Sequence, residues 1–237
     1  MHKPLLAILF SLFIGILQPS YSQSTFDAGY VVTLEGDTIK GFIGSNNKVI
    51  SPVIIAFKET ATASVTSFTP LTAKGFSVNG NFYESATIQV ETSPYKKEEL
   101  TTDKEVHVAT HTIFLEAIVK GSKSLYSYKN EHLNEQFYIK SNDAWELLVF
   151  KRYLQTQKDG KSSIASNMQY VSQLALYLQD YRDVQVKLIS TGYVKNDLKN
   201  LLVTYYEATK KKASFIQKNE KRWMNTLRDA LNEKFRL

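Results

Sequence analysis

Two histidines four residues apart come closest, in type and spacing, to a metal site. On a helix, His107 and His111 would share one face, as two ligands of a zinc ion do. They lie, however, in a run, 106–119, that is typical of a strand, where four residues span about 13 Å. That separation is too long for two ligands of one ion, so the sequence predicts no metal site and no cofactor.

Patterns for nucleophilic catalysis are weak. Ser45 and Lys48 match Ser-x-x-Lys, but they fall in a polar turn, and the chain has neither a Lys-Thr-Gly partner nor a Gly-x-Ser-x-Gly motif. The chain also has no cysteine, which excludes a thiol nucleophile and a cysteine-zinc or iron–sulfur site. We therefore assign no catalytic residue.

Acidic residues form no obvious acid–base pair. Asp37 lies in a pattern typical of a hairpin turn, and Glu98-Glu99 lie in a charged loop. A hydrolase would require polar side chains from distant segments, such as Asp37, Glu84, Glu116 and His107, to converge in one cleft.

Tyrosines on the expected strands leave two interpretations open. Tyr126, Tyr128 and Tyr138 would stack on sugar rings if their faces were exposed. Such residues also commonly seal the rim between a sheet and its helices, with the hydroxyl bound to water or backbone.

The C-terminal residues 210–237 are expected to form a basic amphipathic helix. In a helix, Ile216, Trp223, Leu227 and Leu231 share one face, with basic residues on its flanks. Such a helix can lie in a membrane interface, dock on a partner helix or fold back on its own domain. The candidate contact residues are Lys218, Lys221, Arg222, Trp223, Leu227, Arg228 and Leu231.

The net charge of +6 is concentrated in the same segment. Residues 23–206 carry 19 basic and 19 acidic side chains, whereas residues 207–237 carry nine basic and four acidic ones. An excess of positive charge confined to one end is typical of an interaction tail. For an exported chain we expect an anionic membrane surface or an envelope protein as its partner, and no nucleic acid.

The first 22 residues predict export. His2 and Lys3 precede an apolar run from Pro4 to Leu17, and Ser20 and Ser22 provide small residues for cleavage before Gln23. The run is shorter than the ~20 residues of a membrane span, and no later segment reaches that length. Because no cysteine is available for lipidation, we expect a periplasmic protein that is not a lipoprotein, with the periphery of the outer membrane as one location.

Turn-forming residues are dense before about residue 140 and sparse after it. The first part, 23–140, is expected to be a β-rich module of about eight antiparallel strands, a small barrel or sandwich. Its β-prone runs are 30–34, 38–43, 53–57, 74–78, 82–90, 106–119, 124–128 and 136–140. The glycines around 36 and the pair Asn79-Gly80 indicate hairpins.

The second part, 141–209, is expected to be a helical module, which makes the fold class α+β. Asp143 followed by Glu146 suits a capping box at a helix start. A stripe at Ile164, Met168, Val171, Ala175 and Leu178 follows, and a second stripe begins at Val194. From Tyr193 the sequence allows one helix to the end of the chain or a break near Lys210-Lys211-Lys212.

Several motifs in order resemble an uncharacterised exported domain family of Bacteroidota. They are Gly29-Tyr30-Val31-Val32, then Gly36-Asp37-Thr38-Ile39-Lys40-Gly41-Phe42-Ile43, Gly75-Phe76 with Phe82-Tyr83, and Gly121 with Ser124-Leu125-Tyr126-Ser127-Tyr128. In that family the domain often precedes an outer-membrane β-barrel. The resemblance implies export and a β-then-α layout, and it implies no reaction, ligand or catalytic residue.

Together these patterns predict a non-catalytic adaptor or binding protein of the cell envelope, with the basic C-terminal helix as its contact surface. The alternative is a periplasmic hydrolase or carbohydrate-binding protein with a cleft between the two modules.

Overall fold

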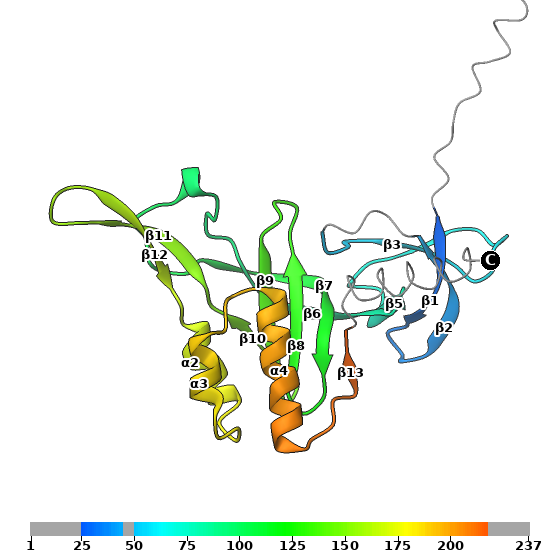
Figure 1. Ribbon diagram of the computed structural model, residues 1–237. Helices are drawn as coiled ribbons and strands as arrows, with labels where there is room; N and C mark the ends of the chain where they lie inside the picture. Colours follow the sequence, from blue (N-terminus) through cyan, green and yellow to red (C-terminus); the bar gives the residue numbers. More distant parts are fainter. Residues whose placement is uncertain (1–24, 45–49, 218–237) are drawn as a thin grey trace, which may run out of the picture.

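The computed structural model describes residues 25–44 and 50–217 (Figure 1). The expected signal peptide and the candidate contact residues 218–231 lie outside them. The strands of the first half are β1 (Phe26–Val32), β2 (Thr38–Gly44), β3 (Ile55–Lys58), β4 (Thr66–Phe68), β5 (Gly75–Val78) and β6 (Asn81–Glu91). After a short 3-10 helix, Lys97–Glu99, come β7 (Val108–Lys120), β8 (Ser124–Lys129), β9 (Glu135–Ser141), β10 (Ala144–Leu148), β11 (Lys151–Thr156) and β12 (Ser162–Asn167). The chain ends in α2 (Tyr170–Tyr177), α3 (Val184–Ile189), α4 (Lys195–Thr209) and β13 (Phe215–Ile216).

One antiparallel sheet organises the molecule. Its strand order is β10-β9-β8-β7-β6-β5-β1-β2-β3-β4, with β13 added to the end of β7, and β11 and β12 form a separate hairpin. A strand-rich antiparallel sheet, with three α-helices among the described residues, confirms the α+β class. The expected eight-stranded barrel or sandwich is not confirmed, because the strands of the main sheet follow one path with ends at β10 and β4.

Local turn chemistry explains the two hairpins that the sequence predicted. Gly36, in the turn between β1 and β2, has a φ of 104°, and in the turn between β5 and β6 Asn79 and Gly80 have φ of 54° and 74°. Glycine and asparagine tolerate such left-handed conformations better than other residues. The turns thereby set the register in which Gly29 lies opposite Gly41, and Val78 opposite Asn81.

The half of the sheet from β6 to β10 curls on itself. In the strand order, β10 and β6 are separated by the three strands β9, β8 and β7, and yet they lie against each other. The side chains inside the curl form one core, to which every strand from β6 to β10 contributes. Its buried members are Ala86, Ile88, Val90, Ile113, Leu115, Ala117, Tyr126 and Tyr138. This half is therefore barrel-like, with an open line between β6 and β10.

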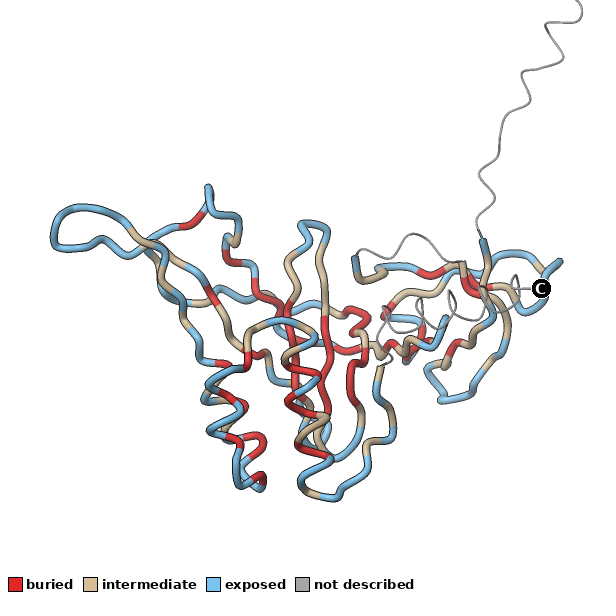
Figure 2. Tube along the Cα trace, in the orientation of Figure 1, coloured by how far each residue is buried: buried red, intermediate tan, exposed pale blue. Residues whose placement is uncertain are grey.

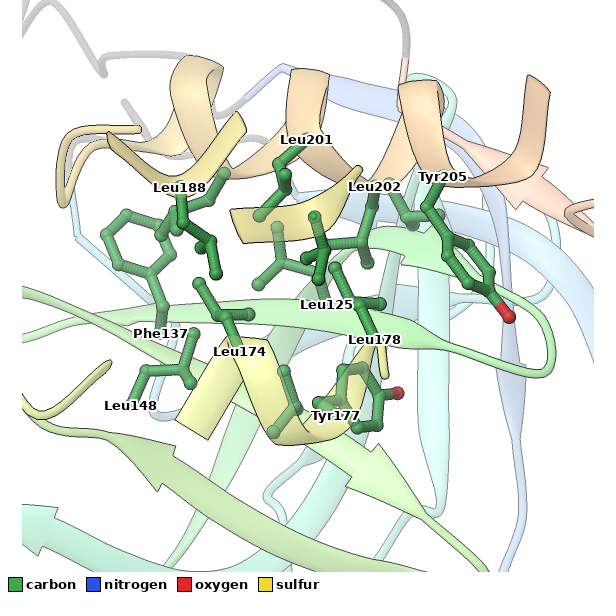
Figure 3. Packing of buried hydrophobic residues seen from close by; sticks show 14 of the residues in the cluster. Leu125, Phe137, Leu148, Leu174, Tyr177, Leu178, Leu188, Leu201, Leu202 and Tyr205 are labelled. Atoms are coloured by element: carbon green, nitrogen blue, oxygen red, sulfur yellow. The ribbon is translucent and has the colours of Figure 1, made fainter. Parts of the chain in front are cut away.

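The helices cover the outer face of the curl. Figure 2 shows buried residues concentrated in the central strands and in the helices. In Figure 3, Leu201 and Leu202 of α4 point toward Leu125 of β8, while Leu174 of α2 and Leu178, the residue after it, close the same core. A further core joins β1, β2, β3 and β5 around Phe76, whose ring stacks on that of Tyr83 at 4.4 Å.

The expectation that helices begin at Ser141 is wrong. Asn142 and Asp143 have φ of 47° and 65°, and they form the tight turn between β9 and β10 instead of a helix cap. Trp145 and Leu147 then pack inside the curl. Asx residues suit both roles, and pairing with β9, which local sequence does not reveal, selects the turn. In the described ranges the first α-helix begins at Tyr170.

The expected helical stripes are partly misplaced. Ile164 belongs to β12, and the exposed Met168 precedes α2. The chain takes the break near Lys210: α4 ends at Thr209, and Lys210 has a left-handed φ of 58°. The expected C-terminal helix does not include Phe215–Ile216, because these residues pair with Lys120 and Val119 of β7 as β13. Main-chain bonds to β7 outweigh helical periodicity here.

Tyrosine hydroxyls tie the helices to the sheet. The hydroxyl of Tyr177 accepts a hydrogen bond from the Ser124 amide at 2.6 Å and donates one to the Lys140 carbonyl oxygen at 2.8 Å. The hydroxyl of Tyr206 similarly accepts from the Lys123 amide at 2.9 Å and donates to its carbonyl oxygen at 2.7 Å. Helix side chains therefore satisfy backbone groups at the start of β8.

Removing one of these hydroxyls should destabilise the fold. We expect Tyr177→Phe to lower the free energy of unfolding by about 2 kcal/mol, because the buried Ser124 amide loses its acceptor. Tyr181→Phe is the matched control, since Tyr181 belongs to the same core and its hydroxyl has no hydrogen-bond partner among the described residues. Urea denaturation of both variants measures the difference, and equal losses would contradict the role of the Tyr177 hydroxyl.

Candidate functional site

The open line between β6 and β10, which we call the seam, is bridged by side chains. β5 pairs with β6 only at Asn81–Glu84, so the edge of β6 beyond Glu84 has no partner strand among the described residues. The Gln136 side chain of β9 takes that place at Glu91: its Oε1 accepts from the Glu91 amide at 2.9 Å and its Nε2 donates to the Glu91 carbonyl oxygen at 2.8 Å. Tyr138 donates from its hydroxyl to the Gln89 carbonyl oxygen at 3.2 Å.

A cavity of about 400 Å³, the Glu91 cavity, opens at one end of the seam. Its lining comes from the end of β6, the loop after it, β9, the start of β11 and the loop before α4. The lining residues are Glu91, Pro94, Tyr95, Asn134, Glu135, Gln136, Phe150, Lys151, Arg152, Tyr193 and Val194. The lining combines residues from 91–136 with residues from 150–194.

Two buried ionisable residues, Glu91 and Lys151, line this cavity. Burial raises the pKa of the Glu91 carboxyl, although the Ser93 hydroxyl and the Lys151 ammonium counteract part of that effect. Lys151 is itself only 4% exposed; its Nζ donates to the Glu105 carbonyl oxygen and lies 3.6 Å from Oδ2 of Asp103. Ionisable side chains are seldom buried in proteins as a whole. Those that are buried, with a shifted pKa, cluster at functional sites.

The wall of the Glu91 cavity is aromatic, but its rings are already engaged. Phe150 and Tyr193 stack on each other at 4.9 Å with an angle of 20° between the rings. The Tyr193 hydroxyl donates to the Leu148 carbonyl oxygen at 2.7 Å, and Arg152 donates to the Tyr95 carbonyl oxygen at 2.6 Å. These contacts hold the aromatic side chains of the cavity wall in place.

A second cavity, the Trp145 cavity, of about 390 Å³, lies along the seam itself. Its lining surface is about equally polar and apolar, and it takes residues from both strands that border the seam. The lining residues are Ile88, Gln89, Val106, Val108, Tyr138, Trp145, Glu146, Leu147, Val149 and Gln173. Trp145 is held in place by an edge-on contact with Tyr126 at 4.7 Å and by the Lys140 ammonium over its ring.

A side chain of α2 covers part of the β10 edge in the Trp145 cavity. Oε1 of Gln173 accepts from the Val149 amide at 2.8 Å, and its Nε2 donates to the Leu147 carbonyl oxygen at 2.8 Å. It also donates to Oε1 of Glu146 at 2.7 Å. Gln173 therefore does at β10 what Gln136 does at β6: its amide makes the two hydrogen bonds that a neighbouring strand would make.

The four residues that a hydrolase would bring together remain apart. Asp37 is exposed in the turn between β1 and β2. Tyr83 pairs with Glu116 while Glu84 pairs with Leu115, so Glu84 and Glu116 lie on opposite faces of the sheet. The Nε2 atom of His107 binds Oδ2 of Asp103 at 2.5 Å in the loop before β7.

Glu84 and Glu116 each sit in a lysine-paired cluster. Glu84 binds Lys120 and lies 3.4 Å from Nζ of Lys140; these lysines hold the pKa of its carboxyl below the ordinary value despite burial. Lys195 of α4 reaches Glu116 at 2.7 Å. Both carboxylates therefore have a structural partner.

The remaining sequence candidates lie as follows. His111 is on β7, and the described part of the chain contains no group of three or more potential metal ligands. Tyr126 and Tyr138 are buried, which favours the sealing role over sugar stacking. Ser45 and Lys48 lie outside the described residues, as do the candidate contact residues, and these assignments remain predictions.

The seam residues were not found by sequence reasoning. Glu91, Gln136, Lys151 and Gln173 occur in no motif, and each is polar in a segment whose neighbours gave no reason to place it inside. The one available signal was the isolated glutamine or lysine beside apolar runs, for example Gln136 before Phe137-Tyr138-Ile139.

Neither a membrane-spanning helix nor a known relative helps to assign a function to these cavities. In the described ranges no helix is both long enough and apolar enough to cross a bilayer. No protein-family model, no curated protein and no solved structure matches the chain.

Proposed function

We propose that this protein is an exported binding protein of the cell envelope, an adaptor without a catalytic role, which holds a partner at the seam. The observation that carries the proposal is the seam itself: two cavities of about 400 and 390 Å³ lie along unpaired strand edges of a barrel-like half-sheet. Cavities at the mouth of a curled sheet are common ligand sites.

The carboxylates around the two cavities favour binding over catalysis. Glu91 lies in the field of Lys151, Glu135 is 3.3 Å from Nζ of Lys195, and Glu146 accepts from Gln173. General acid–base catalysis needs a carboxyl that is free to exchange a proton with a substrate. Carboxylates that already have a partner side chain instead help to hold the shape of the cavities.

Export and attachment complete the proposal. The leader-like residues 1–22 and the order of the resembling motifs support a periplasmic location. β13 fixes the chain to the sheet up to Gln217, whose side chain donates to Glu116 at 2.8 Å and to Asn81 at 3.1 Å. Residues 218–237, with six basic and three acidic side chains, therefore begin directly at the folded body, where they suit contact with an anionic membrane or an acidic partner.

Deletion of residues 218–237 tests the attachment. We expect the full chain to fractionate with membranes and to be released by high salt, which screens electrostatic attraction. The shortened chain, which keeps β13, should appear in the soluble periplasm. Deletion of 210–237 is unsuitable, because it also removes Phe215 and Ile216 from the sheet.

A variant with less positive charge is the matched control. Replacing Lys218, Lys221, Arg222 and Arg228 by glutamine keeps the apolar residues, leaves two basic against three acidic side chains in 218–237 and should also release the protein. Full retention of the 218–237 deletion on membranes would overturn the attachment. Retention of the glutamine variant alone would assign the contact to the apolar residues.

A further inference from the structure

Two carboxylates line the Glu91 cavity, and the first of them has no ion-pair partner of its own among the described residues. The Lys151 ammonium acts on the Glu91 carboxyl only through its electric field. Nζ of Lys151 is instead directed to groups outside the lining: it donates to the Glu105 carbonyl oxygen and lies 3.6 Å from Oδ2 of Asp103. The negative charge of Glu91 is therefore only partly balanced.

The second carboxylate, Glu135, shares its lysine as well. Nζ of Lys195 lies 3.3 Å from Oε1 of Glu135 but only 2.7 Å from Oε2 of Glu116, which does not line the cavity. One ammonium cannot neutralise two carboxylates. Both acidic side chains of the lining thus retain an unbalanced share of negative charge.

The effect of this charge is felt at the aromatic wall. Burial raises the pKa of the Tyr193 hydroxyl, and the charges of Glu91 and Glu135 raise it further. A negative charge opposes the ionisation of a nearby phenol, so both carboxylates act on the same part of the cavity. A cation beside Tyr193 would be attracted by both.

Arg152, the other basic residue of the lining, offsets this attraction only weakly. It is exposed, and its guanidinium donates to the Tyr95 carbonyl oxygen at 2.6 Å. Water and salt screen an exposed charge far more than a buried one, and Glu91 is only 8% exposed. Inside the cavity the buried carboxylate therefore has the larger effect.

The rest of the lining suits the carbon stem of an amine. Tyr95, Phe150 and Tyr193 contribute aromatic rings, which attract ammonium groups and pack well against the methylene groups that carry them. The volume of about 400 Å³ falls within the range of about 300–1,000 Å³ that is typical of small-molecule sites. The cavity thus combines acidic acceptors, aromatic rings and sufficient room.

We propose that the Glu91 cavity binds a primary alkylammonium group, which is attracted by Glu91 and Glu135 and whose methylene stem lies against the aromatic wall. A free aliphatic diamine or a lysine side chain of a partner protein supplies such a group. This inference rests on the proposed binding function and names the chemistry that the seam recognises.

Calorimetric titration of the mature chain, 23–237, with diaminobutane and with Nα-acetyl-lysine methylamide tests the inference. At constant ionic strength we expect at least one of the two amines to bind with a Kd of about 1 mM or tighter. Binding of diaminobutane alone would identify a free diamine as the ligand. Binding of the lysine derivative would show that the lysine side chain of a partner is sufficient.

Two variants locate the bound amine. Glu91→Gln and Glu135→Gln keep the size of the side chain and remove its charge, so each should weaken binding at least about fivefold. Glu207→Gln removes the same charge from an exposed position of α4 outside the lining and should bind normally. If Glu91→Gln fails to fold, Glu135→Gln still gives a result, because Lys195 keeps Glu116 as its partner.

Butanol and sodium butanoate separate charge from size. Butanol keeps the stem without the charge and should not bind. The inference is overturned if neither amine reaches a Kd of about 1 mM, if butanol binds as well as diaminobutane, or if a folded variant of either carboxylate binds as tightly as the unchanged chain. Butanoate that binds while both amines do not would assign the cavity to an anion, which keeps the proposed binding function and overturns this inference.

The tests of attachment and of amine binding fail independently. A chain that leaves membranes on deletion of 218–237 but binds no amine keeps the proposed attachment and loses this inference. A chain that binds amine but never fractionates with membranes keeps the ligand site and loses the attachment.

Discussion

Replacing Gly41 by alanine is expected to lower the free energy of unfolding by about 3 kcal/mol, at the upper end of overpacking effects. A Cβ atom there would lie less than 3.0 Å from the carbonyl oxygen of Lys58 and 2.6 Å from the ring of Phe57. Lys58 is the β3 residue that pairs with Phe42, so its backbone has no room to retreat without loss of the pairing.

Gly44→Ala is the matched control for this prediction. Gly44 ends the same strand, and the nearest atom to its added Cβ would be the side-chain Cβ of Ala56 at 3.3 Å, a contact that a small shift relieves. We expect a loss below about 1 kcal/mol. Urea denaturation compares the two variants, and a similar midpoint for both would show that the tight approach at Gly41 is relieved by movement of β3.

The same reasoning explains a motif. Gly29 lies opposite Gly41 in the pairing of β1 and β2, and a Cβ on Gly29 would lie less than 3.0 Å from the Ser77 carbonyl oxygen of β5. Gly29 therefore lets β5 approach β1 closely, and Gly41 lets β3 approach β2 closely. These two glycines have a packing role that requires no ligand.

Replacing Lys151 by methionine is expected to cost about 3 kcal/mol at about pH 8. The variant keeps the aliphatic stem but removes the ammonium that counteracts the rise in the pKa of the buried Glu91 carboxyl, that donates to the Glu105 carbonyl oxygen and that lies 3.6 Å from Oδ2 of Asp103. Removal of one partner from a buried ionic group is strongly destabilising, because the remaining charge stays desolvated.

The cost should depend on pH with a defined sign. Burial already raises the pKa of Glu91, and loss of the ammonium raises it further. A carboxyl with a raised folded-state pKa contributes stability that is fully present below the unfolded value and is lost as the pH rises through the folded value. The deficit of Lys151→Met should therefore shrink from about pH 8 to about pH 4.

Two controls separate charge from packing in this experiment. Lys151→Arg retains the charge and should lose less than Lys151→Met. Lys161→Met removes a largely exposed lysine, 3.4 Å from Asp159, and should have little effect at either pH. Denaturant midpoints at both pH values measure these differences, and a Lys151→Met deficit that is constant with pH would contradict the coupling to Glu91.

Local chemistry made the first half of the fold predictable. Asn79-Gly80 and Gly36 mark turns because these residues accept a left-handed backbone without help from the rest of the chain. The strands on either side then follow from alternation of apolar and polar residues. Leu198, Leu201 and Tyr205 similarly mark α4, because apolar residues recur every three or four positions on the face that a helix packs against a sheet.

The segment after Ser141 was not predictable in this way. Asn142 and Asp143 suit a helix cap and a tight turn equally well, and Leu147 and Leu148 fit a helical face or a strand in a curled sheet. The pairing of Leu147 with Tyr138, brought about by the turn, decides between them. The same holds for Phe215–Ile216, whose helical periodicity yields to pairing with β7.

The sequence by itself determined the class of fold, two of its hairpins, helix α4 and the charge of its tail, because these depend on neighbours within a few residues. Only the tertiary structure decided where the sheet curls and which edges remain open. The seam depends on the hydrogen bonds from Gln136 to Glu91 and from Gln173 to Leu147. Contacts between residues so far apart in the chain leave no periodicity, so the site became visible only once the strands were in place.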